Sequence, residues 1–276
     1  MTRFKLVRLG FAFIFFISVL CGPWIAELLG DVASVAPRGV PFASSNQLKP
    51  LGTDHLGRPV LGAILHGGQS LLLTAIIGGT LTTIFAAVLG SFGALYPRLG
   101  VVIDTLADAI ILVPSVILML LLTVIFPEAG VWLLILTVAF LGTPYAARVC
   151  AAGAHNIAAT GYVQAAQSLG EPAWKIIVKD IVPNMSHILR SVWGLRIIEA
   201  LYLLAIASFL GVGNSLGQFA WSTMVNENAQ GILLNPWAVG APAVLLGLSS
   251  VVILSALGAA EATDISSQKK VAEYVR

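Results

Sequence analysis

The sequence contains few charged residues, and this scarcity argues against a soluble domain. Its 276 residues include 15 Lys or Arg and 13 Asp or Glu, so 10% of the chain is charged, whereas soluble domains carry about 25%. Hydrophobic residues make up 58% of the chain, and the mean hydropathy is +0.93. The composition therefore indicates an integral membrane protein. A net charge of +2 is too small to suggest a nucleic-acid partner.

Cysteine and histidine are scarce as well. Cys21 and Cys150 are the only cysteines, and both fall in or beside apolar runs, so no disulfide framework or metal cluster can be built from them. The four histidines stand in separate segments without the spacing of metal ligands, and we expect surface or hydrogen-bonded roles for them. The chain also lacks a P-loop GxxxxGK[ST], a GxSxG elbow and an HExxH helix. Neither Walker-type ATP binding nor hydrolase chemistry is therefore expected.

Six apolar runs are each long enough to cross a bilayer. The first extends from Leu9 to about Leu29 and follows three basic residues. No small-x-small cleavage site follows this run, so we interpret it as an uncleaved helix and not as a signal peptide. The other runs cover approximately 70–95, 101–126, 131–150, 188–211 and 237–260. The sequence thus predicts an all-α membrane protein with six transmembrane helices.

The distribution of Lys and Arg predicts the orientation of these helices. With the N-terminus inside, twelve basic residues fall on the cytoplasmic side and three outside, a strong positive-inside bias. Both termini and the 151–187 loop are therefore expected in the cytoplasm. The inside set is Arg3, Lys5, Arg8, Arg98, Arg148, Lys175, Lys179, Arg190, Arg196, Lys269, Lys270 and Arg276, and the outside set is Arg38, Lys49 and Arg58.

The stretch Tyr162–Asn184 is a polar island between apolar runs. Its pattern predicts two short helices with a break at Gly170, where a residue able to adopt a positive φ is expected. Pro172 suits the first turn of the second helix, and Pro183 is expected to end it. The expected apolar faces are Tyr162, Val163, Ala166 and Leu169 in the first helix and Trp174, Ile177, Val178 and Ile181 in the second. The same pattern is also typical of an amphipathic helix that rests on the membrane surface.

The residues of this island resemble the cytoplasmic EAA loop of ABC importer permeases. The resemblance lies in Ala165-Ala166, in Gly170 four residues on, and in Ile181-Val182-Pro183-Asn184. In that family the loop is the coupling helix that docks into the ATPase subunit. The resemblance therefore implies a docking site made of Tyr162, Gln164, Ala165, Ala166, Leu169, Gly170 and Pro183. Gln164 replaces the usual Glu, so an ion pair at that interface would become a neutral hydrogen bond.

A second stretch, in the first segment expected outside, reads LGTDHLGRPVL from Leu51 to Leu61. It resembles the LGTDxLGRDxL…G…SL signature of the dipeptide/oligopeptide/nickel permease subfamily, and its signature residues are Gly52, Thr53, Asp54, Gly57 and Arg58. The two glycines suit tight turns, and the Asp and Arg, four residues apart, are placed to pair. Pro59 replaces the usual Asp. The alternative is a polar loop that merely tucks against the bundle.

A third stretch runs from Phe209 to Trp237 and resembles the FLGLG…SWG-M…PW region of the same subfamily. Its matching residues are Phe209-Leu210-Gly211-Val212-Gly213, Trp221, Met224 and Pro236-Trp237, without the usual double proline. Leu216–Asn228 is expected to form a short amphipathic helix at the outer membrane interface, with Phe219 and Trp221 as anchors.

The resemblance implies the second-permease type of an ABC importer with a type I fold. The expected parts are an N-terminal helix and extracytoplasmic segment (1–69), a five-helix core (70–262) with the coupling loop 151–187, and a cytoplasmic tail (263–276). The implied partners are a homologous permease, two ATPase subunits, an extracytoplasmic substrate-binding protein and membrane lipid, in a prokaryotic inner or plasma membrane. ATP and Mg²⁺ would bind the ATPases, so no cofactor is expected on this chain. Di- or oligopeptides are the expected substrates, with nickel or metallophores as the alternative.

Polar residues inside the expected spans are candidates for a translocation path. Asp104 and Asp108 lie one helical turn apart near the start of the third span, and Pro114 is expected to kink that helix. These carboxylates are either solvated at the cytoplasmic end or part of the path. Arg196 and Glu199, three apart in the fifth span, are placed to pair, and Glu199 is the deeper group. The rival function is an ion-coupled secondary transporter, which would need a carboxylate relay near the midplane.

Overall fold

A computed structural model describes residues 2–36, 39–46, 49–212 and 216–274, with side chains described from Val7 to Gly258. Arg38 lies outside the described residues, and so do residues 213–215, which belong to the third matched stretch. The described chain is helical, and its only β pairings are two isolated bridges, Asn46 with Lys49 and Thr53 with Pro59. The all-α prediction is therefore confirmed.

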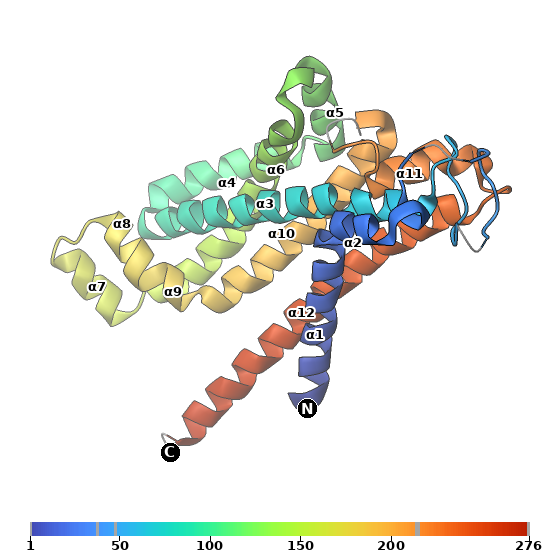
Figure 1. Cartoon of the computed structure of the whole chain (residues 1–276). Helices are drawn as coiled ribbons and strands as arrows, with labels where there is room; N and C mark the ends of the chain where they lie inside the picture. Colours follow the sequence, from blue (N-terminus) through green and yellow to red (C-terminus); the bar gives the residue numbers. More distant parts are fainter. Residues whose placement is uncertain (1, 37–38, 47–48, 213–215, 275–276) are drawn as a thin grey trace.

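Four long helices form the bundle shown in Figure 1. They are α3 (Val60–Leu95), α6 (Gly130–Ala158), α10 (Ser186–Ala207) and α12 (Trp237–Tyr274). The helix α3 packs along both α6 and α10, and its buried face consists largely of Gly, Ala, Thr and Ser. Small residues let helix backbones approach closely in a membrane, where association depends on van der Waals packing.

The helical boundaries extend past the hydropathy boundaries. The helix α3 begins at Val60 and not near residue 70, α6 continues past residue 150 to Ala158, and α12 continues through residue 262 to Tyr274. Hydropathy reports where lipid-compatible residues lie, whereas a helix continues as long as its backbone hydrogen bonds do. Neither of the boundaries expected at 69/70 and 262/263 coincides with a break in a helix.

The first apolar run is broken, whereas the sequence predicts one continuous helix from Leu9 to Leu29. The run divides into α1 (Thr2–Leu20) and α2 (Gly22–Leu29), and the segments Val7–Leu20 and Gly22–Ala33 meet at an angle of 64°. Pro23 lies in the first turn of α2. In a continuous helix its ring would clash with the carbonyl group four residues earlier, and it has no N–H to donate. This proline accounts for the break.

The third apolar run is also bent, as expected from Pro114. The helices α4 (Pro97–Ile111) and α5 (Ser115–Ile125) meet at 81°, with Pro114 immediately before α5. Proline restricts the residue before it to extended conformations, so the helix ends before Pro114. By length and composition, four described helices can cross a membrane, or up to six if each bent pair counts as one span. The upper count agrees with the six spans predicted.

Two sets of short elements lie at opposite ends of α3 (Figure 1). At one end, α7 (Gly161–Ser168), α8 (Ala173–Ile176), the π-helix η3 (Ile177–Ile181) and α9 (Val182–Asn184) connect α6 to α10. At the other end, α11 (Trp221–Asn228) packs beside the segment 49–59. The remaining short elements are the 3₁₀ helices η1 (Gly30–Ala33), η2 (Pro127–Ala129) and η6 (Ala229–Gly231) and the π-helix η4 (Ser208–Val212).

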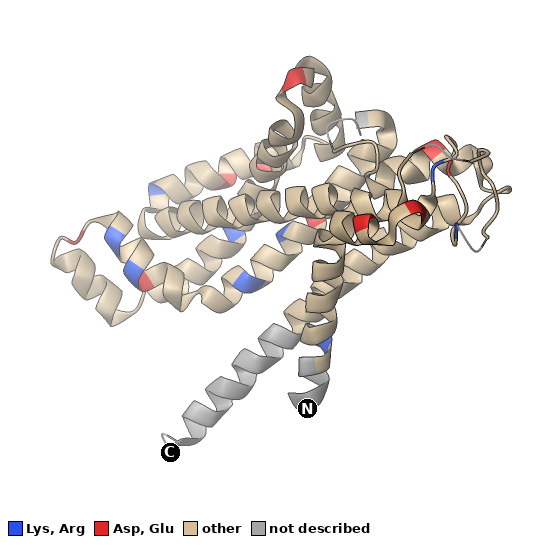
Figure 2. Cartoon of the chain, viewed as in Figure 1, with Lys and Arg blue, Asp and Glu red and all other residues tan. Residues whose placement is uncertain are grey.

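Each end has its own hydrophobic core. One cluster of buried side chains includes Leu71, Leu204 and Trp221 and supports the α11 end. The other includes Val163, Ile181 and Met185 and ties the α7–α9 segment to α3 and α6. Basic residues are prominent at the α7–α9 end in Figure 2. The predicted coupling loop therefore lies at the α7–α9 end of the bundle, and the other two matched stretches lie at the α11 end.

Candidate docking loop and polar sites

Gly170 ends α7 with the two hydrogen bonds of a Schellman motif. The N–H of Gly170 donates to the carbonyl of Gln167 at 3.0 Å, and the N–H of Glu171 donates to the carbonyl of Ala166 at 3.1 Å. This motif places one residue in the left-handed region, and Gly170 has φ 76°. A Cβ atom at this position would meet nothing within 4 Å. The backbone alone therefore favours glycine here, which confirms the predicted break.

The helix α7 has a buried side and an exposed side. Val163 is fully buried and Ala166 packs against the same core, whereas Ala165 is exposed. Tyr162 is half exposed and Leu169 is 84% exposed. The predicted single apolar face of Tyr162, Val163, Ala166 and Leu169 is therefore wrong. Leu169 is the C-cap of α7 and still donates its N–H to the carbonyl of Ala165 at 3.0 Å, but its side chain projects outward.

The second part of the loop is helical, as predicted, but it buries a different set of side chains. The chain is helical from Ala173, directly after Pro172, through Asn184, with η3 inside it, so the helical segment ends one residue after Pro183. Ile177 and Ile181 are buried as predicted, but Trp174 and Val178 are 64% and 61% exposed, and Ile176 is buried in their place.

Polar groups on this loop are used within it or exposed. Lys175 Nζ contacts Glu171 Oε1 at 2.5 Å, a pair spaced i, i+4 that follows the Gly170 turn. Gln164 is exposed, and its Nε2 donates to the carbonyl of Ala159 at 3.4 Å. The exposed side chains of this loop therefore include the apolar Tyr162, Leu169 and Trp174 and the neutral Gln164. Such a surface suits contact with another protein.

The opposite end of the bundle contains a buried ion pair. Arg58 Nε donates to Asp54 Oδ2 at 2.6 Å, and the two side chains are 7% and 2% exposed. Asp54 Oδ1 also accepts the backbone N–H of Leu56 at 2.9 Å and that of Arg58 at 2.8 Å. Gly57, at φ 75°, closes the turn between them. The pair predicted from the spacing is therefore confirmed, with every carboxylate oxygen bonded.

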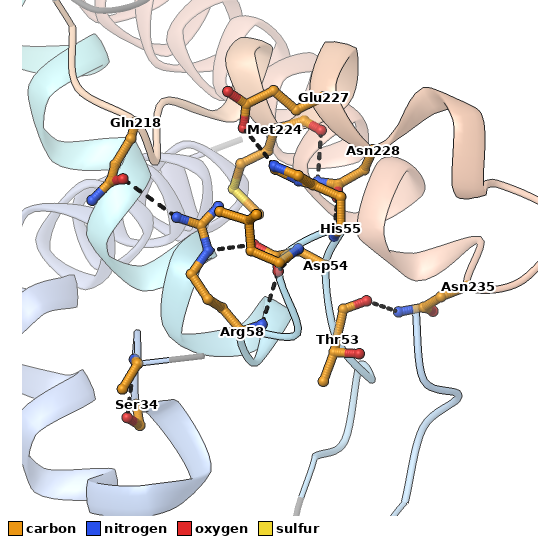
Figure 3. A network of polar contacts seen from close by, with 12 residues as sticks. Ser34, Thr53, Asp54, His55, Arg58, Gln218, Met224, Glu227, Asn228 and Asn235 are labelled. Atoms are coloured by element: carbon orange, nitrogen blue, oxygen red, sulfur yellow. Dashed lines mark hydrogen bonds and ion pairs between the residues drawn. The ribbon is translucent and has the colours of Figure 1, made fainter. Parts of the chain in front are cut away.

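The second and third matched stretches bind each other (Figure 3). Arg58 Nη1 donates to Gln218 Oε1 at 3.4 Å, and its guanidinium carbon lies 5.1 Å from the centre of the Phe219 ring. The contacts continue on both sides. The backbone N–H of His55 donates to Asn228 Oδ1 at 2.9 Å, Asn235 Nδ2 donates to the carbonyls of Leu51 and Thr53 at 3.0 and 2.9 Å, and Ser70 Oγ donates to the carbonyl of Leu216 at 2.6 Å. We call residues 39–46, 49–60 and 216–237 together the cap.

Trp221 lies in the core and not at a membrane interface. The prediction that it anchors an interfacial helix is wrong: its side chain is 1% exposed, and its Nε1 donates to the carbonyl of Ile64 at 2.9 Å. Gly67 of α3 leaves the space for this arrangement, because a Cβ there would lie 1.7 Å from the carbonyl oxygen of Phe219. An amphipathic pattern does not distinguish a lipid interface from an internal polar cap.

Asp104 and Asp108 share one partner that the sequence did not indicate. Arg148 of α6 donates from Nη2 to Asp108 Oδ1 at 2.6 Å and to the carbonyl of Asp104 at 2.7 Å, and from Nε to Asp104 Oδ1 at 3.2 Å. The two carboxylates share a face of α4, as predicted, and both side chains are exposed in the single chain. Because Arg148 is 40 and 44 residues away, no local spacing could have revealed it.

Glu199 is paired within its own helix, as predicted. It contacts Arg196, whose side chain is 12% exposed against 43% for Glu199. The Arg196 guanidinium carbon also lies 5.3 Å from the centre of the Tyr145 ring of α6. The candidate path residues of α4, α6 and α10 thus form two groups, Asp104–Asp108–Arg148 and Arg196–Glu199. No group of three or more His, Cys, Asp or Glu that could hold a metal ion occurs among the described residues.

Comparisons with known proteins agree with this geometry. Residues 79–262 match the family described as binding-protein-dependent transport system inner membrane component. The chain is 25% identical over 256 residues to a putative peptide transport system permease protein of Brucella abortus, covering 92% of this chain and 85% of that protein. It is 26% identical over 193 residues to the oligopeptide transport system permease protein OppC of Bacillus subtilis (70% and 63%). It is 24% identical over 236 residues to the probable D,D-dipeptide transport system permease protein DdpC of Escherichia coli (85% and 78%).

Proposed function

This chain belongs to the family of binding-protein-dependent transport system inner membrane components, and from that premise we propose that it is the permease subunit of an ATP-driven importer of di- or oligopeptides. Membership makes it a multi-pass inner-membrane protein that works with an ATPase and a substrate-binding protein. The names of the relatives favour peptides over nickel or metallophores.

The observation that carries the proposal is the loop from α7 to α9. It lies beyond the end of α3 (Figure 1), it is fixed to α6 by a buried apolar side, and its other side exposes Tyr162, Ala165 and Leu169. We propose that this exposed side docks on one of two ATPase subunits, which bind ATP and Mg²⁺. A motion of the docked ATPase would then pass directly into α6 and α10, the helices that flank the loop.

The path itself is proposed to lie against a homologous second permease. Asp108 and Glu199 sit on exposed parts of α4 and α10, beside Arg148 and Arg196. Charged side chains of membrane helices face a water-filled cavity or another protein because lipid contact is costly. We therefore propose that Asp108 and Glu199 line the interface between the two permeases, through which substrate crosses.

Docking is tested with two variants of the loop. Ala165 is exposed, so Ala165→Trp should block close approach of a partner, and Gly170→Val should strain the Schellman turn. We expect both to insert normally but to weaken copurification of the ATPase and ATP-dependent uptake. Ala166→Trp is a less selective test because Ala166 packs against the core. Asn156→Trp, at an exposed position on α6, is the matched control. Wild-type ATPase association and uptake in both variants would refute docking by this loop.

Orientation is tested by single-cysteine labelling in a background without Cys21 and Cys150. We propose that both termini and residues 151–187 are cytoplasmic and that the cap is outside. Residue 175 should be protected from an impermeant reagent in intact cells, and Ser45→Cys, at an exposed position of the cap, should be labelled. External labelling of residue 175 would contradict the proposed orientation.

The energy source separates this proposal from a secondary transporter. In an ATP-driven importer Asp108 is not an obligatory proton relay, and in this structure it pairs with Arg148. Asp108→Asn should therefore retain substantial ATP-dependent uptake. Uptake that follows the proton gradient, ignores ATP and disappears in Asp108→Asn would establish the secondary transporter instead.

A further inference from the structure

An apolar groove with a volume of about 460 Å³ lies between α1, α10 and α12. Its walls include Phe13 and Phe16 of α1, Trp193 and Ile197 of α10, and Ile253 and Leu257 of α12. Figure 1 shows α1 crossing beside α12 at the end of the molecule that carries the N-terminus. The helices α10 and α12 close the groove on one side, because Gly194 permits contact: a Cβ there would lie 2.1 Å from Leu257 Cδ1.

One charged residue, Arg190, lines this groove among the described residues. It lies in the second turn of α10, at the end of the bundle where the docking loop joins. Trp193 follows one turn further along, and its Nε1 donates to Thr80 Oγ1 at 2.9 Å. Beyond it the wall is apolar. A basic residue, then a tryptophan, then hydrocarbon is the order of side chains from the surface of a membrane into its interior.

We infer that this groove binds an acyl chain of an anionic phospholipid from the cytoplasmic leaflet, with the lipid phosphate on Arg190. A guanidinium carries five N–H donors in a planar fork, so a phosphate can be one of several groups that it binds. The cytoplasmic leaflet is the source of anionic lipid, and basic pockets between membrane helices on that side bind such headgroups. This inference goes beyond the proposed transport function and rests only on the proposed orientation.

The lining favours lipid over a protein segment for a chemical reason. Apart from the guanidinium at one end, the groove offers side chains that match hydrocarbon. A protein helix would fill the groove with side chains of its own and would not in general place a negative group at Arg190. A phospholipid has one negative group followed by a flexible hydrocarbon chain, which is the order in which the groove presents Arg190 and its apolar walls. Arg190 also explains why headgroup charge, and not only chain length, should decide which lipid is retained.

The test measures lipids that remain bound to the intact purified importer. The complex is equilibrated with equal amounts of phosphatidylglycerol and phosphatidylethanolamine, washed in mild detergent and analysed by native mass spectrometry. Wild type should retain phosphatidylglycerol preferentially. Arg190→Gln should lower the ratio of bound phosphatidylglycerol to phosphatidylethanolamine about fivefold, since one basic residue near an anionic surface contributes about 1 kcal/mol. Arg190→Lys should be intermediate, because it retains charge without the planar fork.

Two controls make the result specific. Arg98→Gln removes an exposed basic residue that does not line the groove, and it should leave the ratio unchanged. Ala256→Trp, which fills the groove, should lower the retention of both lipids. An unchanged ratio in Arg190→Gln, unchanged retention in Ala256→Trp, or an efficient cross-link from Phe13→Cys to the second permease would each overturn the inference. Orientation is measured separately by the labelling experiment, so its failure is distinguishable from absence of lipid.

Discussion

The cap and the docking loop each contain a glycine in almost the same backbone conformation, but the surroundings of the two glycines differ. Gly57 has φ 75° and Gly170 has φ 76°. A Cβ on Gly57 would lie 2.1 Å from the carbonyl oxygen of Gly39, whereas a Cβ on Gly170 would meet nothing within 4 Å. The cap turn is packed against its own chain, and the loop turn faces open space.

The polar and apolar groups of the two regions follow the same division. In the cap, Asp54 and Arg58 are buried and bonded to each other and to neighbouring segments. In the docking loop, Leu169 is 84% exposed and Tyr162 is half exposed. Matched sequence motifs can therefore have opposite physical roles: one stabilises the fold of its own chain, and the other presents a surface.

The largest expected effect is the loss of the cap ion pair. Asp54→Ala removes the acceptor of Arg58 Nε and of two backbone N–H groups, and it leaves the guanidinium buried. Breaking a buried pair from one side costs about 3–5 kcal/mol. The stability of the purified chain in detergent, measured by thermal or denaturant unfolding, should fall accordingly.

The matched control for the ion pair is Glu227→Gln in the same cap. Glu227 lies 3.8 Å from His55 and is 39% exposed, and exposed pairs contribute about 0–1 kcal/mol. Similar unfolding curves for the Asp54 and Glu227 variants would show that burial of the pair does not distinguish the two sites.

The two glycines provide the next comparison. Both Gly57→Ala and Gly170→Ala place a Cβ in the left-handed region, which costs about 1–2 kcal/mol. In Gly57→Ala the collision with Gly39 adds a packing strain of about 1–3 kcal/mol. Gly57→Ala should therefore destabilise the chain about twice as much as Gly170→Ala in the same unfolding assay. Equal losses would mean that the cap relaxes without cost.

Much of the helical architecture could be predicted from the sequence. The six apolar runs locate the spans, and Pro114 marks the bend between α4 and α5. The break at Cys21 had an equally clear signal in Pro23, which hydropathy does not register. Proline acts on backbone geometry, whereas hydropathy counts transfer into lipid. Helix ends and bends therefore need to be derived from capping residues and prolines, and not from the ends of apolar runs.

The sites were predictable where their contacts are local. The Asp54–Arg58 pair and the Gly170 turn depend on residues within five positions, and the sequence indicates both. The Arg148 partner of Asp104 and Asp108 comes from another helix, and the burial of Trp221 depends on α3. Such contacts depend on how helices pack, which spacing within one segment does not specify. Only the structure joins the second and third matched stretches into one cap.

The smallest stability change should come from Leu169→Ala, and this variant separates the two regions most sharply. Leu169 is 84% exposed, so truncating it removes little buried surface, and the free energy of unfolding should change by less than about 0.5 kcal/mol. If the loop docks, however, the same side chain is buried in the complex, and ATPase copurification should fall several-fold. Quantified copurification and detergent unfolding of one preparation measure both effects, with Asn156→Ala as an exposed control. Because the cap variants should instead lose stability first, a Leu169 variant that unfolds early but binds the ATPase normally would place this residue in the scaffold of its own chain.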